Sequence, residues 1–298
     1  MLVRVKRRKV FVKRVPLTVQ EYAEPFATRN LSGVPGFFNY GIGSMGSNAW
    51  RELAAATQAT EWVLDGRCEG FAMLLHHRVV TRSRRAAAPA GKWLDDYVCY
   101  WGSSPRIRKR VVERITGPAE LLLFFEYFPA VWADDHRSDL SNVVTGAAEV
   151  ARIVEFLGAH GMTHFDAHPH NVMRDAQRYY LTDFGLALDR QFDLAASEHR
   201  FLDRHRHYDQ ANVVARVVGF LIRRFETASV GQQAAVFRHL GIHALTDRST
   251  LQGLLVDQIE AVTDILGLSD AYREWVIRYR DVIKLMTRFD RAMVKSPG

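Results

Sequence analysis

One polar stretch near the middle of the chain constrains its fold more than any other feature. His164 and Asp166 are followed by Asn171, and a D-F-G sequence begins at Asp183. A carboxylate can accept the proton of an attacking hydroxyl group, and carboxylate and amide oxygens are ligands that Mg²⁺ prefers. The stretch therefore supplies a candidate proton acceptor, Asp166, and two candidate metal ligands, Asn171 and Asp183.

The residues on either side predict the local structure of this stretch. Residues 144–158 have the apolar spacing of a helix, and Gly161 is a natural stop after it. The apolar pieces 172–173 and 179–182 enclose a short polar run, which predicts a hairpin. We therefore expect a helix to lead into the polar stretch and a hairpin to lead out of it towards Asp183.

In this order and spacing, H-x-D-x-x-x-x-N and D-F-G resemble the motifs of the protein-kinase-like superfamily, which includes protein kinases and the aminoglycoside and choline kinases. The helix-and-glycine sequence at 157–163 fits the same resemblance. The resemblance implies an α+β fold with a small antiparallel-sheet lobe at 1–128 and a mainly helical lobe at 129–298. The two lobes would form one kinase-like domain that uses ATP and Mg²⁺.

The resemblance also implies roles for the motif residues in phosphoryl transfer. Asp166 would accept the proton of the acceptor hydroxyl, and Asn171 and Asp183 would hold Mg²⁺. His168 occupies a position where protein Ser/Thr kinases carry lysine and where aminoglycoside- and choline-type kinases often carry histidine. A histidine there can donate a hydrogen bond to the transferred phosphate, so the implied catalytic set is Asp166, His168 and Asn171.

The N-terminal residues predict a β-hairpin. Apolar strands are expected at 2–6 and 10–15, with a polar turn between them and Pro16 closing the second strand. The second strand resembles the kinase strand that carries the ATP lysine, which implies that Lys13 contacts the α- and β-phosphates. The basic residues around Lys13 leave a second interpretation open, that it is one more solvated charge. No glycine precedes Lys13, so the resemblance is to an atypical kinase with a truncated small lobe, or the true start lies upstream of Met1.

A helix is expected at 48–64, at the position of the kinase helix whose glutamate pairs with the ATP lysine. Glu52 fits that role better than Glu61 because it lies in the N-terminal half, and a solvated surface glutamate is the alternative. Residues 41–46 spell G-x-G-x-x-G ahead of this helix. We interpret them as a turn before a helix cap, with phosphate binding at the helix N-terminus as the alternative.

Two further apolar segments predict strands. Residues 71–80 have the composition of a buried strand. Residues 121–129 resemble the last strand of the kinase small lobe and the hinge that follows it. The resemblance implies that backbone groups of Glu126, Tyr127 and Phe128 bind the adenine of ATP, while a plain core strand is the alternative.

The chain after the D-F-G sequence is notable for what it lacks. Protein kinases carry a longer activation segment that ends in A-P-E, and no A-P-E occurs here. Tyr208 and Asp209 precede an apolar helix expected at 211–225. Asp209 resembles the kinase aspartate that braces the catalytic loop, with an ordinary N-cap as the alternative. The later apolar patterns, at 232–240 and beyond, predict helical packing.

Composition narrows the class of protein. The net charge of +7 favours anionic ligands, but the basic residues are spread along the chain and no nucleic-acid motif occurs. The longest apolar run, 121–132, contains Glu126 and Pro129 and is too short to span a bilayer. Only Cys68 and Cys99 are present, and no signal peptide is recognised, so we expect a protein of the reducing cytoplasm.

The pattern as a whole predicts an ATP- and Mg²⁺-dependent phosphotransferase whose acceptor hydroxyl belongs to a small molecule or an unconventional protein substrate. Three alternatives remain open. The chain could be a conventional protein Ser/Thr kinase, or a pseudokinase that serves as a nucleotide-binding or interaction module. It could also be an unrelated metal-dependent hydrolase that uses His164, His168 and His170 as ligands.

Overall fold

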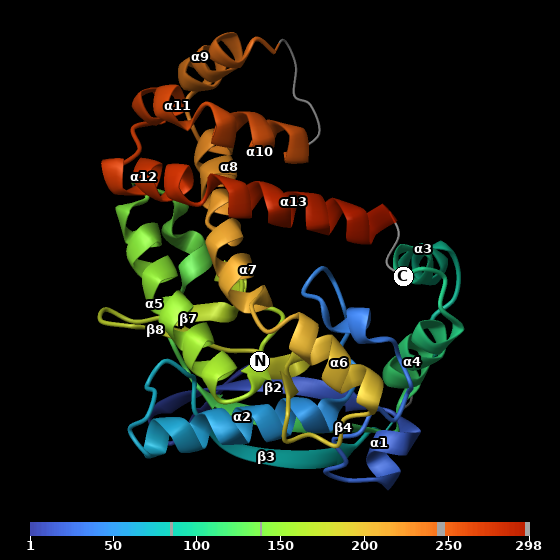
Figure 1. The fold of residues 1–298 in the computed structure, drawn as a ribbon. Coiled ribbons are helices and arrows are strands. Elements are labelled where there is room, and N and C mark those ends of the chain that lie inside the picture. The colour runs from blue at the N-terminus through green and yellow to red at the C-terminus, as the bar shows by residue number, and fades with distance from the viewer. Residues whose placement is uncertain (84–85, 138, 243–247, 296–298) are drawn as a thin grey trace.

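The computed structural model describes residues 1–83, 86–137, 139–242 and 248–295, and it shows an α+β protein (Figure 1). The strands are β1 (Leu2–Val5), β2 (Arg8–Leu17), β3 (Leu74–Thr81), β4 (Ala119–Glu126), β5 (Ala130–Val131), β6 (Met162–Thr163), β7 (Val172–Arg174), β8 (Tyr179–Leu181) and β9 (Leu188–Asp189). The α-helices are α1 (Val19–Ala23), α2 (Ala49–Leu64), α3 (Lys92–Tyr100), α4 (Pro105–Thr116), α5 (Ser141–Ala159), α6 (Ala196–Arg204), α7 (Tyr208–Arg216), α8 (Val218–Glu226), α9 (Val230–Leu240), α10 (Arg248–Asp257), α11 (Ile259–Leu266), α12 (Asp270–Arg278) and α13 (Arg280–Lys295).

The largest sheet is antiparallel and has four strands in the order β1-β2-β4-β3. The expected N-terminal hairpin is present, and β2 pairs along its length with β4, with Lys13 opposite Leu123. Side chains alternate along a strand, so Lys13 shares a face of β2 with Val15 and Leu17, which are buried in the main core. This alternation turns Lys13 towards the interior of the molecule.

The prediction that Pro16 closes the second strand is wrong by one residue. The pairing of β2 with β4 includes Pro16, opposite Glu120, and ends at Leu17. β1 pairs only with residues 8–11 of β2, so at Pro16 the other edge of β2 has no partner strand. A proline can occupy such a position because its missing N–H is not needed there.

The prediction of a buried strand at 71–80 is only partly correct. Phe71 makes an isolated bridge to Leu181, and the strand proper, β3, begins at Leu74. Most of β3 is exposed, because it pairs only with β4 and forms the edge of the sheet. His76 and His77 are accordingly surface residues.

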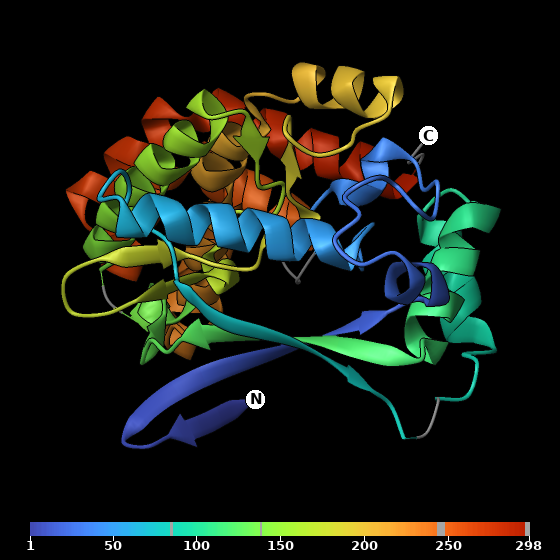
Figure 2. The same ribbon diagram turned by 90° about the horizontal axis from the view of Figure 1, so that it is seen from below.

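Helix α2 lies against the sheet, between its strands and the helices of the C-terminal part of the chain, whereas α1, α3 and α4 lie at one end of the sheet (Figures 1 and 2). Its start is fixed by Asn48, whose side chain accepts a hydrogen bond from the backbone N–H of Trp50, as expected for a cap. The buried face of α2 includes Trp50, Glu52 and Leu53. A glutamate on the buried face is unusual, and its partner is described below.

The chain beyond β4 is mainly helical. The expected helix before the polar stretch is α5, and the expected hairpin after it is β7 and β8. The single helix predicted at 211–225 is instead two helices, α7 and α8, which meet at Val217. Within the described ranges, no helix combines the length and the apolar character needed to cross a membrane.

Candidate active site

Three residues from distant parts of the chain form an ion triad. The Lys13 ammonium nitrogen lies 2.5 Å from Oε1 of Glu52 and 2.5 Å from Oδ1 of Asp183. Lys13 comes from β2, Glu52 from the first turn of α2, and Asp183 from the loop after β8. The expected pairing of Glu52 with Lys13 is therefore present, and the Glu52 side chain is only 2% exposed, which excludes a solvated surface glutamate.

The triad keeps Lys13 charged. Burial lowers the pKa of Lys13, but the carboxylates of Glu52 and Asp183 outweigh it, so the pKa lies above its usual value. The pKa of Asp183 lies below its usual value: burial raises it, but the adjacent Lys13 ammonium lowers it more. Burial raises the pKa of Glu52 despite the same ammonium group. The result is a fixed positive charge held between two carboxyl groups.

The Asp209 side chain anchors the backbone of the polar stretch through hydrogen bonds. Its carboxylate accepts hydrogen bonds from the backbone N–H groups of His164 (2.5 Å) and Phe165 (2.8 Å). Phe165 has a φ of 64°, a left-handed conformation that is strained for a residue with a side chain. Asp209 lies in the first turn of α7, where His207 is the N-cap. The bracing interpretation of Asp209 therefore describes its contacts, and the N-cap interpretation does not.

His164 has a fixed neutral tautomer. Its Nδ1 accepts a hydrogen bond from the backbone N–H of Asp166 (3.2 Å), so its protonated Nε2 donates to the carbonyl of Thr182 (3.0 Å). Burial lowers the pKa of His164, in agreement with an uncharged ring. The ring thus ties Asp166 to the residue that precedes Asp183.

Asp166 and Asn171 are directly connected. The Asn171 side-chain amide donates to the backbone carbonyl of Asp166 (3.0 Å) and to its carboxylate Oδ2 (2.8 Å). The other carboxylate oxygen, Oδ1, lies 3.3 Å from Nε2 of His168. Nδ1 of His168 accepts a hydrogen bond from the backbone N–H of His170, which fixes the direction of the ring. Asp166 is therefore oriented from both sides.

A cavity of about 530 Å³ connects this centre with the end of β4. It is lined at one end by Lys13, Asn171 and Asp183, and at the other by residues that include Glu126, Tyr127 and Phe128. The size suits a nucleotide, since ligand cavities commonly have 300–1,000 Å³. We call it the nucleotide cavity after the ligand that the sequence predicts for it.

The far end of this cavity offers an aromatic surface and a free donor. The Phe128 ring stacks on Tyr180 with centroids 4.0 Å apart. The backbone N–H of Glu126 already donates to the carbonyl of Met73 (3.0 Å). In the described part of the chain, nothing accepts a hydrogen bond from the backbone N–H of Phe128, so this donor remains for a ligand.

The donor set at the near end fits Mg²⁺. Asn171 and Asp183 supply hard oxygen atoms, and no hydrogen bond within the described ranges engages Asn171 Oδ1 or Asp183 Oδ2. Mg²⁺ is commonly bound by one or two such side chains together with substrate phosphates. The two residues can therefore contribute ligands without any rearrangement of the triad.

The three histidines of the polar stretch do not form a metal cluster. Both ring nitrogens of His164 are engaged, and Nε2 of His170 accepts a hydrogen bond from Arg223 (2.6 Å). Across the residues that the structure describes, no group of three or more His, Cys, Asp and Glu side chains is placed to hold a metal ion. The geometry thus offers no support for the hydrolase alternative.

Two residues near the site were not among the site residues predicted from the sequence. Arg114 on α4 is close enough to Glu52 and Asp183 for their charges to raise its pKa. Burial and the charge of Arg110 outweigh this effect and lower the pKa of Arg114 to about 10. Gly41, in the turn before α2, donates its backbone N–H to the carbonyl of Phe165 (3.0 Å). The glycine pattern at 41–46 was visible in the sequence, but its contact with the polar stretch was not.

Comparison with known proteins gives no relative: no protein-family model matches the chain, and no curated protein matches its sequence significantly.

Proposed function

We propose that this chain is an ATP- and Mg²⁺-dependent phosphotransferase of the protein-kinase-like type, which transfers the γ-phosphoryl group to an acceptor hydroxyl. The observation that carries the proposal is the ion triad of Lys13, Glu52 and Asp183. It is assembled from three distant segments, and it lies in the same cavity as Asn171. A lysine held by a glutamate beside a metal-binding aspartate is the arrangement that phosphoryl transfer from ATP requires in kinases.

A two-lobed arrangement belongs to the same proposal. The four-stranded sheet and α2 come from residues 1–128, and α5 to α13 come from 129–298. The nucleotide cavity is lined by Phe11 and Lys13 of the first part and by Met173 and Asp183 of the second. We propose that the adenine binds between these parts and forms hydrogen bonds with backbone groups of residues 126–128.

In the proposed reaction Lys13 neutralises charge on the nucleotide phosphates. Asn171 and Asp183 would hold Mg²⁺, which would supply further charge neutralisation. Asp166 accepts the proton of the acceptor hydroxyl as the oxygen–phosphorus bond forms and the bond between the γ-phosphorus and the ADP oxygen breaks. His168, whose Nε2 lies 3.3 Å from Oδ1 of Asp166, would orient that carboxylate.

A small-molecule acceptor is favoured over a peptide. The chain passes directly from the D-F-G sequence through residues 186–195 to α6, so it has no long segment there on which a peptide could lie. A conventional protein Ser/Thr kinase would need such a platform.

The test is Mg²⁺-dependent turnover of ATP by the purified chain with Asp166→Ala, Asp183→Ala and, as a matched control, Asp264→Ala, which removes an exposed aspartate of α11. We expect turnover in the wild type and the control, and none in the other two variants. Unchanged turnover in either folded site variant would refute the proposal. Stabilisation of the wild type by MgATP without any transfer of phosphate would instead identify a pseudokinase.

A further inference from the structure

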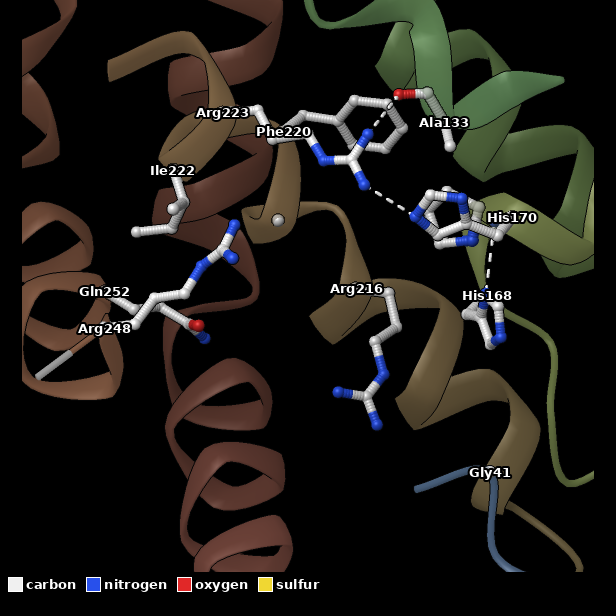
Figure 3. Close-up of a pocket in the computed structure, with 12 residues that line it drawn as sticks. Gly41, Ala133, His168, His170, Arg216, Phe220, Ile222, Arg223, Arg248 and Gln252 are labelled. Carbon is white, nitrogen blue, oxygen red and sulfur yellow. Dashed lines mark hydrogen bonds between the residues drawn. The ribbon is translucent and has the colours of Figure 1, made fainter. Parts of the chain in front are cut away.

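A second cavity, of about 310 Å³, lies next to the polar stretch and is lined by arginines (Figure 3). Arg216 comes from α7, Arg223 from α8 and Arg248 from the start of α10. Figure 3 shows Arg248 on one side of the cavity and His168 and His170 on the other, with the Arg223 guanidinium group beside His170. We call this cavity the arginine pocket.

The arginine pocket carries positive charge. Arg223 donates to the Ala133 carbonyl (3.2 Å) and to Nε2 of His170 (2.6 Å), and both acceptors are uncharged when the ring is neutral. A ring nitrogen that accepts a hydrogen bond carries no proton, so His170 is neutral in this arrangement. Among the described residues, no carboxylate forms an ion pair with Arg223, and no Asp or Glu lines the pocket.

The other two arginines have carboxylate partners that lie outside the pocket lining. Arg216 is paired with Asp290 (2.8 Å), which lies outside the pocket lining. Arg248 is 3.5 Å from Glu226, a long ion pair between two exposed side chains. Such a pair is worth little, so an anion in the pocket can compete for Arg248. The negative charge of Asp134 also acts on His170, but Asp134 lines the nucleotide cavity rather than the arginine pocket.

The arginine pocket lies next to the candidate proton acceptor, Asp166, which is not itself among the residues that line either cavity. The carboxylate of Asp166 lies between Gly41 and His168, and both of these residues line the pocket. His170 lines both cavities, so the segment 168–171 separates them. A small molecule in the arginine pocket would thus present a hydroxyl group to Asp166 while the nucleotide phosphates occupy the other side.

We propose that the arginine pocket binds the anionic group of the acceptor, so that the substrate is a small hydroxyl-bearing phosphate ester or carboxylate. Guanidinium groups recognise both anions through paired N–H donors. A polycation such as an aminoglycoside would be repelled by the same charges. This inference rests on the proposed function, because it concerns the acceptor of the same reaction.

The first experiment measures binding without turnover. The chain is saturated with MgADP, and its melting temperature is followed against inorganic phosphate, glycerol 3-phosphate and gluconate, with glycerol and kanamycin as neutral and cationic probes. We expect at least one anionic probe to stabilise the wild type. That probe should bind roughly 10- to 100-fold more weakly to Arg223→Gln and Arg248→Gln, as for the loss of one charged hydrogen bond.

Two controls make the result specific. Arg278→Gln removes an exposed arginine of α12 that does not line the pocket, and it should bind the anion as the wild type does. The Arg223→Gln substitution keeps a side-chain donor for the Ala133 carbonyl. If that variant does not fold, Arg248→Gln changes an exposed residue and provides the second test. Asp183→Ala should lose stabilisation by MgATP and keep its response to the anion, which separates this inference from the proposed function.

The second experiment measures transfer of labelled phosphate from ATP to the hydroxyl-bearing probes. We expect the anionic ones to be phosphorylated in preference to glycerol and kanamycin, with a KM raised about tenfold or more in Arg223→Gln. Preferred use of a neutral or cationic acceptor would overturn the inference. So would the absence of any anion effect on the melting temperature, or equal anion affinity in the wild type and both pocket variants.

Discussion

Gly41 passes so close to Asp166 that no side chain fits between them. A Cβ atom at position 41 would lie 2.1 Å from Oδ1 of Asp166 and 2.8 Å from the carbonyl oxygen of Phe165. The turn before α2 therefore forms a wall of the site, and the absence of a side chain at position 41 leaves the carboxylate of Asp166 in its place. At position 41 of the glycine pattern, this contact is a physical reason for the absence of a side chain.

Gly41→Ala tests this contact. The added methyl group must displace the Asp166 carboxylate or move the turn, and a shift of about 1 Å at a reacting group can lower kcat by roughly 10- to 100-fold. We expect steady-state kinetics to show a lower kcat with little change in the KM for ATP. Gly253→Ala is the matched control, because nothing lies within 4 Å of a Cβ at that position on α10. Equal kcat values for the two variants would contradict the interpretation.

The ion triad predicts a stability effect that can be separated from activity. Lys13→Met leaves the buried Glu52 without its counter-ion, and breaking a buried pair costs about 3–5 kcal/mol. Adding Glu52→Gln should restore much of the free energy of unfolding, since no buried charge then remains unpaired at position 52. Chemical denaturation measures both variants, and neither should turn over ATP. If the double variant is no more stable than Lys13→Met alone, the buried glutamate is not the source of the loss.

Asp209 should be needed for the stability of the polar stretch. Asp209→Ala leaves the backbone N–H groups of His164 and Phe165 without acceptors in a buried place, at a cost of about 1–3 kcal/mol each. We expect the free energy of unfolding to fall by about 2–6 kcal/mol and ATP turnover to fall with it, since the strained Phe165 is no longer held. Asp203→Ala, which removes an exposed carboxylate on α6, should change stability by less than about 1 kcal/mol.

His164 predicts a dependence of stability on pH. Its pKa is lowered in the folded chain, so above its unfolded value of about 6.5 the ring is neutral in both states and its contribution is complete. As the pH falls below 6.5 the unfolded chain gains a proton that the folded chain resists, and the free energy of unfolding decreases. The slope from this one group reaches at most about 1.4 kcal/mol per pH unit.

His164→Gln provides the comparison, because glutamine carries a donor and an acceptor but does not titrate. Denaturation curves between pH 5 and 7.5 should show a shallower loss of stability on acidification in this variant than in the wild type. His170 and His205 also have lowered pKa values, so part of the slope should remain. An identical slope in both proteins would show that His164 is not one of the titrating groups.

Much of the local structure could be predicted from short-range pattern. The hairpin before Lys13, the helix with its cap at Asn48 and the segment around Asp166 each follow from neighbouring residues. The predictions were wrong where the burial or the end of a strand depends on a pairing partner far away in the sequence. The exposure of β3 depends on its place at the sheet edge, and the run of β2 past Pro16 depends on how far β1 extends.

The sequence by itself determined which chemical groups are available: a lysine in a strand, a glutamate in the first turn of a helix, and the Asp166, Asn171 and Asp183 spacing. Spacing along the chain restricts local conformation, so it was enough to place these groups on their elements. Only the tertiary structure decided that Gly41 lies against Asp166 and that arginines of three separate helices share one pocket. Those contacts join residues far apart in sequence, and they depend on helix packing and buried charge that no local pattern contains.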